Sequence, residues 1–339
     1  MTPDPEVDTR DFLAALRARA ASRMRTLVFP EGNEPRIHAA VRTIVHEGLG
    51  RPVLVGTPPA IRDGLRHSGT DPDAVEILDS SDPELIAQTR AWLGERRAGR
   101  EDPLSRLEVW SQDPLMQAGR LLATGKVDGV VAGCARTTGD VVRAALTCVG
   151  LAEGIHTLSS SFYMVFDQDH RVGPCVLSFT DAGVVPEPDA QQLAEIAAAA
   201  VAARDRIVGD EARVAFLSYS THGSADGAGV QAARAARALF QKLRPDVAAD
   251  GELQGDAALV PAVAERKSPG SAVGGRANVL VFPDLNAANI SYKLVQHLGG
   301  ASALGPVLQG LRRPYNDLSR GAEAEDIVSV ACITSLMAD

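Results

Sequence analysis

The segment TLVFPEGNEPRIHAAVRTIVHEGLGRPVLV, residues 26–55, decides the fold class of this 339-residue chain. It begins with a short apolar run, Thr26–Pro30, which is typical of a buried strand. After the turn EGNEP, the apolar residues recur at helical spacing: Ile37, Val41, Ile44, Val45 and Leu49. Gly48 and Gly50 end this helix, and Pro52–Val55 is the next strand. A strand–helix–strand unit of this kind indicates a parallel sheet.

The same alternation continues along the first half of the chain. Further helices and strands are expected at Pro58–His67, Val75–Leu78, Pro83–Arg97, Asp113–Thr124 and Asp128–Ala132. A charged segment at residues 96–106 looks mobile. Since ligands of open parallel sheets bind outside the carboxyl ends of the strands, the loops that follow these strands are the first places to search for a site.

The pattern changes near residues 150–157. Ser159–Phe166 and Gly173–Ser178 look like neighbouring strands, and an Ala-rich helix follows Asp189. Two more strands are expected at Arg213–Leu217 and Asn278–Phe282. Because 339 residues are many for a single hydrophobic core, we expect two α/β domains.

Composition excludes several classes of protein. The formal net charge of −9 argues against a general nucleic-acid or anionic-membrane binder. We find no secretory signal and no apolar run near the ~18 residues that a membrane span requires. The four cysteines contain no CxxC pair: Cys134, Cys148, Cys175 and Cys332. The expectation is a soluble, cytoplasmic protein with reduced, mostly buried cysteines.

Familiar catalytic and cofactor motifs are missing. The chain has no HExxH, no GxSxG and no histidines at metal-ligand spacing, so we expect no metal site. The Ser/Gly-rich loop Ser218–Gly229 lacks the patterns of a P-loop and of a dinucleotide site. His222 lies in this loop and could face a ligand.

One candidate anion site follows the strand Asp128–Ala132. The loop Gly133–Asp140, GCARTTGD, offers glycines and the hydroxyls of Thr137 and Thr138, and Arg143 follows on the next helix. A Thr-Gly-Asp helix cap explains the same residues equally well.

A second candidate lies in the turn-rich segment Gly305–Asp326, GPVLQGLRRPYNDLSRGAEAED. It offers a hydroxyl at Ser319, a guanidinium at Arg320 and a carboxylate at Asp326, close to the start of a helix. This set suits a small oxyanion at a helix N-terminus with a base nearby. The alternative is an ordinary capped helix with a surface arginine.

The order of several motifs resembles the phosphate acetyl/butyryl transferase family, over most of the chain. The residues that carry the resemblance are Asp128–Gly133, Thr137–Thr138 with Asp140–Leu146, Arg213–Gly223, Glu252–Gln254 with Asp256–Ala258, Asn278–Asn289, Tyr292–Gln296, Gly305–Gly310, and Asn316–Gly321 with Glu325–Ile327. The family pattern differs here at Gly139, Ala144 and Arg136, and Arg136 adds a cation beside the candidate anion loop.

The resemblance implies a two-domain α/β enzyme with its active site in the cleft between the domains. The first domain, residues 1–152 and 306–339, would be a three-layer αβα domain with a mainly parallel sheet, carrying the catalytic loop and the C-terminal helix. Residues 153–305 would form a smaller α/β domain. The implied reaction is reversible: acetyl-CoA and phosphate give CoA and acetyl phosphate. It needs no metal or redox cofactor, and the family implies a homodimer.

By motif position, the resemblance implies that Asp326 is the general base for the CoA thiol. Ser319 would hydrogen-bond the thiol or the oxyanion, and Arg320 with Arg143 would hold the phosphate or the acyl oxygen. Substrate-binding roles are implied for Thr137, Thr138 and Asn316. Two alternatives stay open: a transferase for propanoyl or butanoyl groups, and a non-catalytic module that senses acetyl-CoA.

Overall fold

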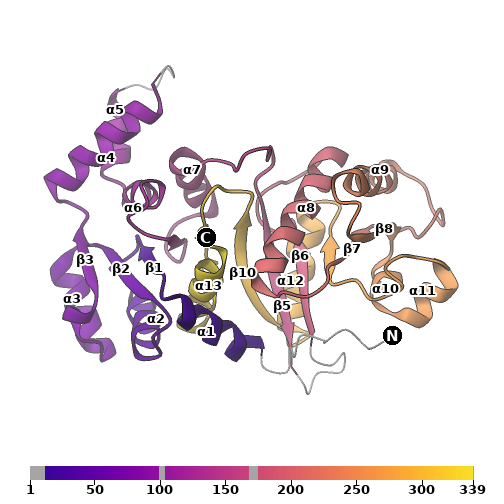
Figure 1. Ribbon diagram of the computed structural model, residues 1–339, viewed down its shortest axis with the longest axis horizontal. Helices are drawn as coiled ribbons and strands as arrows, with labels where there is room; N and C mark the ends of the chain where they lie inside the picture. The colour runs from indigo at the N-terminus through magenta and orange to yellow at the C-terminus, as the bar shows by residue number, and fades with distance from the viewer. Residues whose placement is uncertain (1–11, 99–103, 168–174, 339) are drawn as a thin grey trace. The chain divides into compact units, whose positions relative to one another are not determined.

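The structure is a computed structural model that describes residues 12–98, 104–167 and 175–338 (Figure 1). The chain divides into two compact units. Residues 13–153 and 311–339 form the discontinuous unit, and residues 154–310 form most of the continuous one. The sequence-based division has the chain pass from one domain to the other between residues 152 and 153 and again between 305 and 306. In the structure the chain passes between the two compact units at 153/154 and 310/311.

The discontinuous unit is built on a five-stranded parallel sheet. Its strands in spatial order are β11 (Tyr315–Asp317), β4 (Gly129–Ala132), β1 (Thr26–Phe29), β2 (Arg51–Gly56) and β3 (Glu76–Asp79). Every neighbouring pair in this sheet is parallel, as the alternation of strands and helices predicts. Strand β4 is buried throughout, and β2 is buried after its exposed first residue, Arg51, because helices cover both faces of the sheet.

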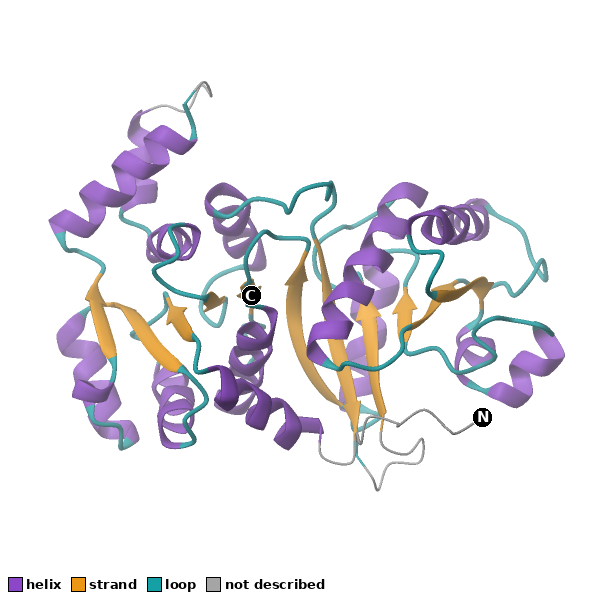
Figure 2. Ribbon diagram, viewed as in Figure 1, coloured by secondary structure: helices purple, strands orange, loops and turns teal. Residues whose placement is uncertain are grey.

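Two groups of helices pack around this sheet (Figure 2). The helices of the discontinuous unit are α1 (Phe12–Arg23), α2 (Pro35–His46), α3 (Pro58–Ser68), α4 (Pro83–Arg96), α5 (Leu104–Ser111), α6 (Pro114–Ala123), α7 (Thr138–Cys148) and α13 (Ala324–Met337). A short 3-10 turn lies at Pro72–Ala74. Helices α2, α3 and α13 pack in one group, and α4, α6 and α7 in the other. Four of the helices begin with proline, whose fixed φ suits the first helical turn.

The continuous unit contains a six-stranded mixed sheet. Its strands in spatial order are β10 (Ser302–Gln309), β5 (Ser159–Phe166), β6 (Cys175–Thr180), β9 (Val279–Val281), β7 (Arg213–Leu217) and β8 (Ala248–Leu253). The pairs β10–β5 and β5–β6 are antiparallel, whereas the pairs from β6 onward are parallel. The predicted neighbouring strands near residues 159 and 175 are confirmed.

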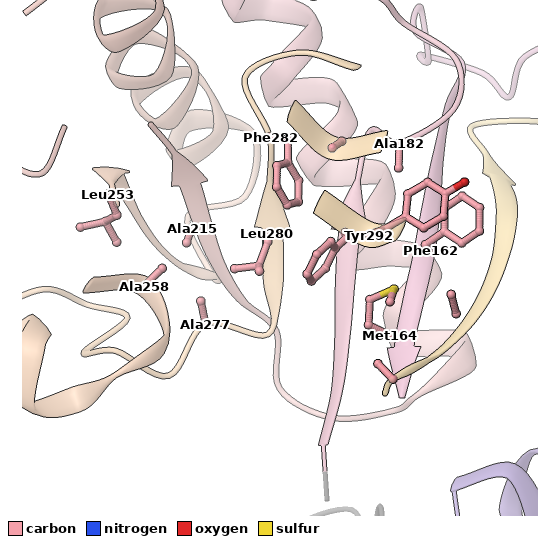
Figure 3. Packing of buried hydrophobic residues seen from close by; sticks show 14 of the residues in the cluster. Phe162, Met164, Ala182, Ala215, Leu253, Ala258, Ala277, Leu280, Phe282 and Tyr292 are labelled. Atoms are coloured by element: carbon pink, nitrogen blue, oxygen red, sulfur yellow. The ribbon is translucent and has the colours of Figure 1, made fainter. Parts of the chain in front are cut away.

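The continuous unit has its own hydrophobic core (Figure 3). Helices α8 (Ala190–Ile207), α9 (Ala228–Leu243), α10 (Gly255–Leu259), α11 (Pro261–Lys267) and α12 (Leu285–His297) surround the sheet. Phe162 stacks on Tyr292 with ring centroids 3.9 Å apart, which fixes α12 on β5. Among the described residues, no helix combines the length and the apolar character needed to cross a membrane.

Three local features of the structure go beyond the sequence-based expectations. The segment 305–326 is not uniformly turn-rich, because it contains the end of β10 and the whole of β11. Strand β8 was not predicted, and the charged segment 96–106 includes the start of helix α5, while residues 99–103 lie outside the described part. In β10 the register shifts between Leu304 and Val307, so Gly305 and Pro306 sit at a bulge, where proline is tolerated.

Candidate functional site

Three loops of the discontinuous unit leave its sheet at the same edge. Strands β11, β4 and β1 are parallel neighbours, and Asp317 lies opposite Ala132 in the register. The loops that follow these strands are residues 318–323, 133–137 and 30–34. Because ligands of parallel sheets bind at the carboxyl ends of the strands, these carboxyl-edge loops form the candidate site.

The loop after β11 presents Ser319 and Arg320 to solvent. The Ser319 Oγ accepts a hydrogen bond from the Gly321 N–H at 3.2 Å, so its own hydrogen is free to donate. Within the part of the chain that the structure describes, the Arg320 side chain has no hydrogen-bond or ion-pair partner, although its backbone carbonyl has one. Both side chains are therefore placed to meet a ligand.

Asp326 lies in the first turn of α13 and is partly exposed. It forms a reciprocal capping box with Glu323: the Asp326 Oδ2 accepts from the Glu323 N–H at 2.9 Å. This bond fixes the orientation of the carboxylate and uses one of its two oxygens. Helix α13 begins at Ala324, which confirms the prediction that Asp326 lies close to the start of a helix.

Thr137 and Thr138 begin helix α7 beside this loop. Thr137 is the N-cap, and its hydroxyl exchanges hydrogen bonds with Asp140 at 2.8 Å to Oδ2 and 3.2 Å from the backbone N–H. The Thr138 hydroxyl donates to the Asp317 Oδ2 at 2.7 Å. Thr138 therefore ties the first turn of α7 to a residue two positions before Ser319.

The two arginines near α7 have different surroundings. Arg143 is exposed, and its Nη1 lies 2.8 Å from the Asp140 Oδ1 on the same helix. Arg136 makes a two-point contact with Asp113 at 3.1 and 3.0 Å, and this pairing raises its pKa. Asp113 therefore neutralises Arg136, the additional cation that the sequence analysis noted beside the loop. Arg143 keeps most of its N–H donors for a ligand.

The backbone of the loop after β4 does not serve as an open anion cradle. The Glu31 carboxylate accepts from the N–H groups of Gly133 at 2.7 Å, Cys134 at 3.0 Å and Ala135 at 2.8 Å. These are the donors that an incoming phosphate would need. The N–H groups of residues 133–135 are therefore already bonded to a carboxylate of the protein, and the candidate anion site that the sequence placed in this region is left with the Thr137 and Thr138 hydroxyls and Arg143.

Arg36, which the sequence analysis did not single out, contacts two carboxyl-edge loops. Its Nη1 donates to the carbonyls of Arg320 at 2.8 Å and Ala322 at 2.9 Å, and its Nη2 donates to that of Cys134 at 2.8 Å. The Nε donates to Glu34 at 2.8 Å, a contact that raises the pKa of Arg36. No local sequence pattern marks this residue, because two of its loop partners are nearly 300 positions away.

Asn316 and Asp317 are buried in β11 rather than exposed at the edge. The Asn316 amide donates to the Thr334 hydroxyl at 2.9 Å, which joins β11 to α13. This contact gives Asn316 a structural role in the core. Burial raises the pKa of Asp317 to about 7, although the hydrogen bond from Thr138 opposes the shift. Among the residues that the structure describes, the Asp317 Oδ1 has no hydrogen-bond partner.

His222 belongs to the continuous unit and lies beside buried acidic residues. Its Nε2 is 3.1 Å from the Asp250 Oδ2. Nearby, burial would raise the pKa of Glu252, but hydrogen bonds from Arg234 and Gly223 lower it to about 2. Among residues 12–98, 104–167 and 175–338, no group of acidic, histidine or cysteine side chains is arranged to hold a metal ion.

A parallel sheet whose carboxyl edge presents a hydroxyl, a guanidinium and a carboxylate is typical of α/β enzymes that act on small anionic ligands. Comparison with known proteins narrows this class. Residues 11–335 match the family model described as phosphate acetyl/butaryl transferase. The chain therefore belongs to this family and is an enzyme of the transferase class.

Three similar proteins illustrate the match. A phosphate acetyltransferase of Acetivibrio thermocellus is 40% identical over 327 residues, which are 96% of this chain and 98% of that protein. One of Thermoanaerobacterium thermosaccharolyticum is 41% identical over 327 residues, 96% of this chain and 99% of that protein. The crystal structure of a phosphotransacetylase from Streptococcus pyogenes is 36% identical with a TM-score of 0.88, and the match covers 96% of this chain and 98% of that one.

Proposed function

We propose that this protein transfers an acetyl group reversibly between coenzyme A and inorganic phosphate. The observation that carries the proposal is the pair Ser319 and Arg320, which lie exposed between β11 and α13 with Asp326 on the first turn of the helix. Family membership supports the same reaction. Coenzyme A is a substrate in this scheme.

Asp326 is the proposed general base. A free thiol has a pKa of ~8.5, so it is mostly protonated at neutral pH and needs a base to become a nucleophile. The Glu323 N–H holds one carboxylate oxygen of Asp326, and the other oxygen accepts the thiol proton of CoA. The thiolate then attacks the carbonyl carbon of acetyl phosphate, the bond from that carbon to the phosphate oxygen breaks, and phosphate leaves with the electron pair.

Ser319, Arg320 and Arg143 are the proposed donors to the developing charge. The Ser319 hydroxyl, whose oxygen already accepts from the Gly321 N–H, donates to the tetrahedral oxyanion. Arg320 and Arg143 are both exposed and hold the phosphate or the acyl oxygen. A preorganised donor of this kind is worth about 3–4 kcal/mol in related sites. Thr137 and Thr138 are the proposed further contacts to the substrate, at the start of α7, where their hydroxyls donate to Asp140 and Asp317.

Release of free thiol from acetyl-CoA in the presence and absence of phosphate tests the proposal. The expected result is rapid, phosphate-dependent release of CoA together with acetyl phosphate. Propanoyl-CoA and butanoyl-CoA should react more slowly at equal concentration. Faster turnover of butanoyl-CoA would assign the longer-chain reaction instead, and binding of acetyl-CoA without any turnover would favour the sensing module.

We further propose that the protein is a homodimer and that α12 contributes to the interface. Ile290 and Leu294 of α12 and the C-cap residue Leu298 are 57%, 53% and 83% exposed, and they recur every four residues, so they lie along one face of the helix and its C-terminal end. Sedimentation analysis of the wild type should give the mass of a dimer. Leu298→Asp should shift it toward the monomer, and a monomeric wild type would contradict the proposal.

A further inference from the structure

Glu31, in the loop between β1 and α2, and Arg36, in the first turn of α2, bond to the backbone of the carboxyl-edge loops in opposite ways. Glu31 supplies oxygens to three N–H groups of the loop after β4, those of residues 133–135. Arg36 supplies N–H groups to one carbonyl of that loop, Cys134, and to two carbonyls of the loop after β11. The two side chains therefore bond to polar backbone groups of both loops.

Arg36 is itself held in place. Its side chain is only 28% exposed. Its Nε–H donates a hydrogen bond of 2.8 Å to the carboxylate of Glu34, the N-cap residue of α2. With the Nε fixed, the planar guanidinium directs its two terminal nitrogens toward the two loops at the same time. A flexible cation with one ammonium group could not satisfy acceptors in these three directions with the same geometry.

We propose that Glu31 and Arg36 are positioning residues, which we name the loop clamp, and that the clamp sets the spacing between the Ser319–Arg320 loop and the start of α7. The proposal rests on the proposed function of that loop. Arg36 holds the backbone carbonyls of Arg320 and Ala322 on either side of Gly321, so it fixes the direction in which the Arg320 side chain leaves the loop.

The expected consequence concerns the chemical step more than binding. Catalytic groups must be held in register with the reacting atoms, and a displacement of about 1 Å can cost about 100-fold in rate. Without the guanidinium, the carbonyls of residues 134, 320 and 322 would turn toward water, and the loops that carry them would separate. The affinity for CoA should change little, because neither clamp residue is one of the proposed substrate-binding residues.

Arg36→Lys tests the clamp, with phosphate-dependent thiol release as the first readout. We expect kcat to fall about 10- to 100-fold, with KM for acetyl-CoA changed less than about threefold. The second readout does not depend on activity. Amide hydrogen exchange should become faster in peptides that cover residues 133–137 and 318–323, and stay unchanged in the continuous unit.

Arg42→Lys is the matched control, because Arg42 is an exposed arginine on the same helix α2. It should leave kcat and the exchange pattern unchanged. Should Arg36→Lys fail to fold, Glu34→Gln loosens the same guanidinium without replacing it, and should lower kcat about 3- to 10-fold. The clamp is refuted if Arg36→Lys, or Glu34→Gln in its place, is active with the kcat of the wild type, or if amide exchange in the two loops is unchanged in that variant. If the wild-type protein releases no thiol from acetyl-CoA, the proposed function is wrong. The amide exchange of the two loops in Arg36→Lys still tests the clamp in that case.

Discussion

Asp317→Asn should change how the stability of this protein depends on pH. Asp317 is fully buried in β11, and its Oδ1 has no hydrogen-bond partner in the described part of the chain. Burial raises its pKa from the ordinary value of 3.8 to about 7, and the negative charge of Glu31 acts in the same direction. The Thr138 hydroxyl, which donates to Oδ2, opposes the shift.

The sign and size of the effect follow from this shift. The native state keeps the proton up to pH about 7, whereas the unfolded chain releases it near pH 4, so the native state loses stability as the pH rises between these values. Each pKa unit corresponds to about 1.4 kcal/mol, so a shift of about three units gives an upper limit of about 4 kcal/mol. Asparagine has nearly the same shape and does not titrate in this range.

Urea unfolding of the wild type and of Asp317→Asn, measured from pH 5 to pH 8, provides the assay. The two proteins should be similar in stability at pH 5, and the variant should be more stable at pH 8 by up to about 3 kcal/mol, because about two of the three pKa units of the shift lie above pH 5. Asp73→Asn, at an exposed aspartate of the same unit, should follow the wild-type pH dependence. Equal pH dependence of Asp317→Asn and the wild type would refute the reasoning.

Other substitutions probe the same loops and the second unit. Gly133→Ala should lower the thermal midpoint by several degrees, because φ is +110° and a Cβ would collide with the Asp317 carboxylate; an unchanged midpoint would count against this packing. Ser319→Ala should lower kcat roughly 100-fold in the thiol assay with little loss of stability, and unchanged kcat would exclude its role as a donor. Glu252→Gln should destabilise the protein by about 1.5–3 kcal/mol in urea unfolding, because the buried Glu252 side chain loses its charge-assisted hydrogen bond from Arg234; an unchanged free energy of unfolding would contradict this.

Much of the fold could be predicted because its information is local. An apolar run predicts the strand at Thr26–Phe29, and the helical spacing of apolar residues predicts helix α2. The alternation of strands and helices then predicts the parallel sheet. Strand β8 could not be predicted, because its burial depends on residues that are distant in the sequence. Its Asp250 and Glu252 read as loop residues, and they are buried only because Arg234 and the Ser220–Gly223 turn supply partners from another part of the chain.

The candidate site shows the same division. Ser319 and Asp326 lie seven positions apart, so the sequence could place them in one loop and helix start. The roles of Glu31 and Arg36 depend on backbone groups about 100 and nearly 300 positions away, and no local pattern encodes such a pairing. Asn316 belongs to the same sequence motif as Ser319, but it lies in strand β11, where its side chain is buried and bonds to Thr334. The spacing of the motif alone does not show which residues of a strand are buried.

Thiol release by Asp326→Asn, measured together with calorimetric binding of CoA, tests the central claim most directly. Asparagine keeps the shape and a hydrogen-bond acceptor for the Glu323 N–H but cannot take the thiol proton. We expect turnover to fall about 100-fold or more, with the affinity for CoA nearly unchanged. Wild-type turnover in this variant, with CoA still bound, would show that another group removes the thiol proton and would contradict the account.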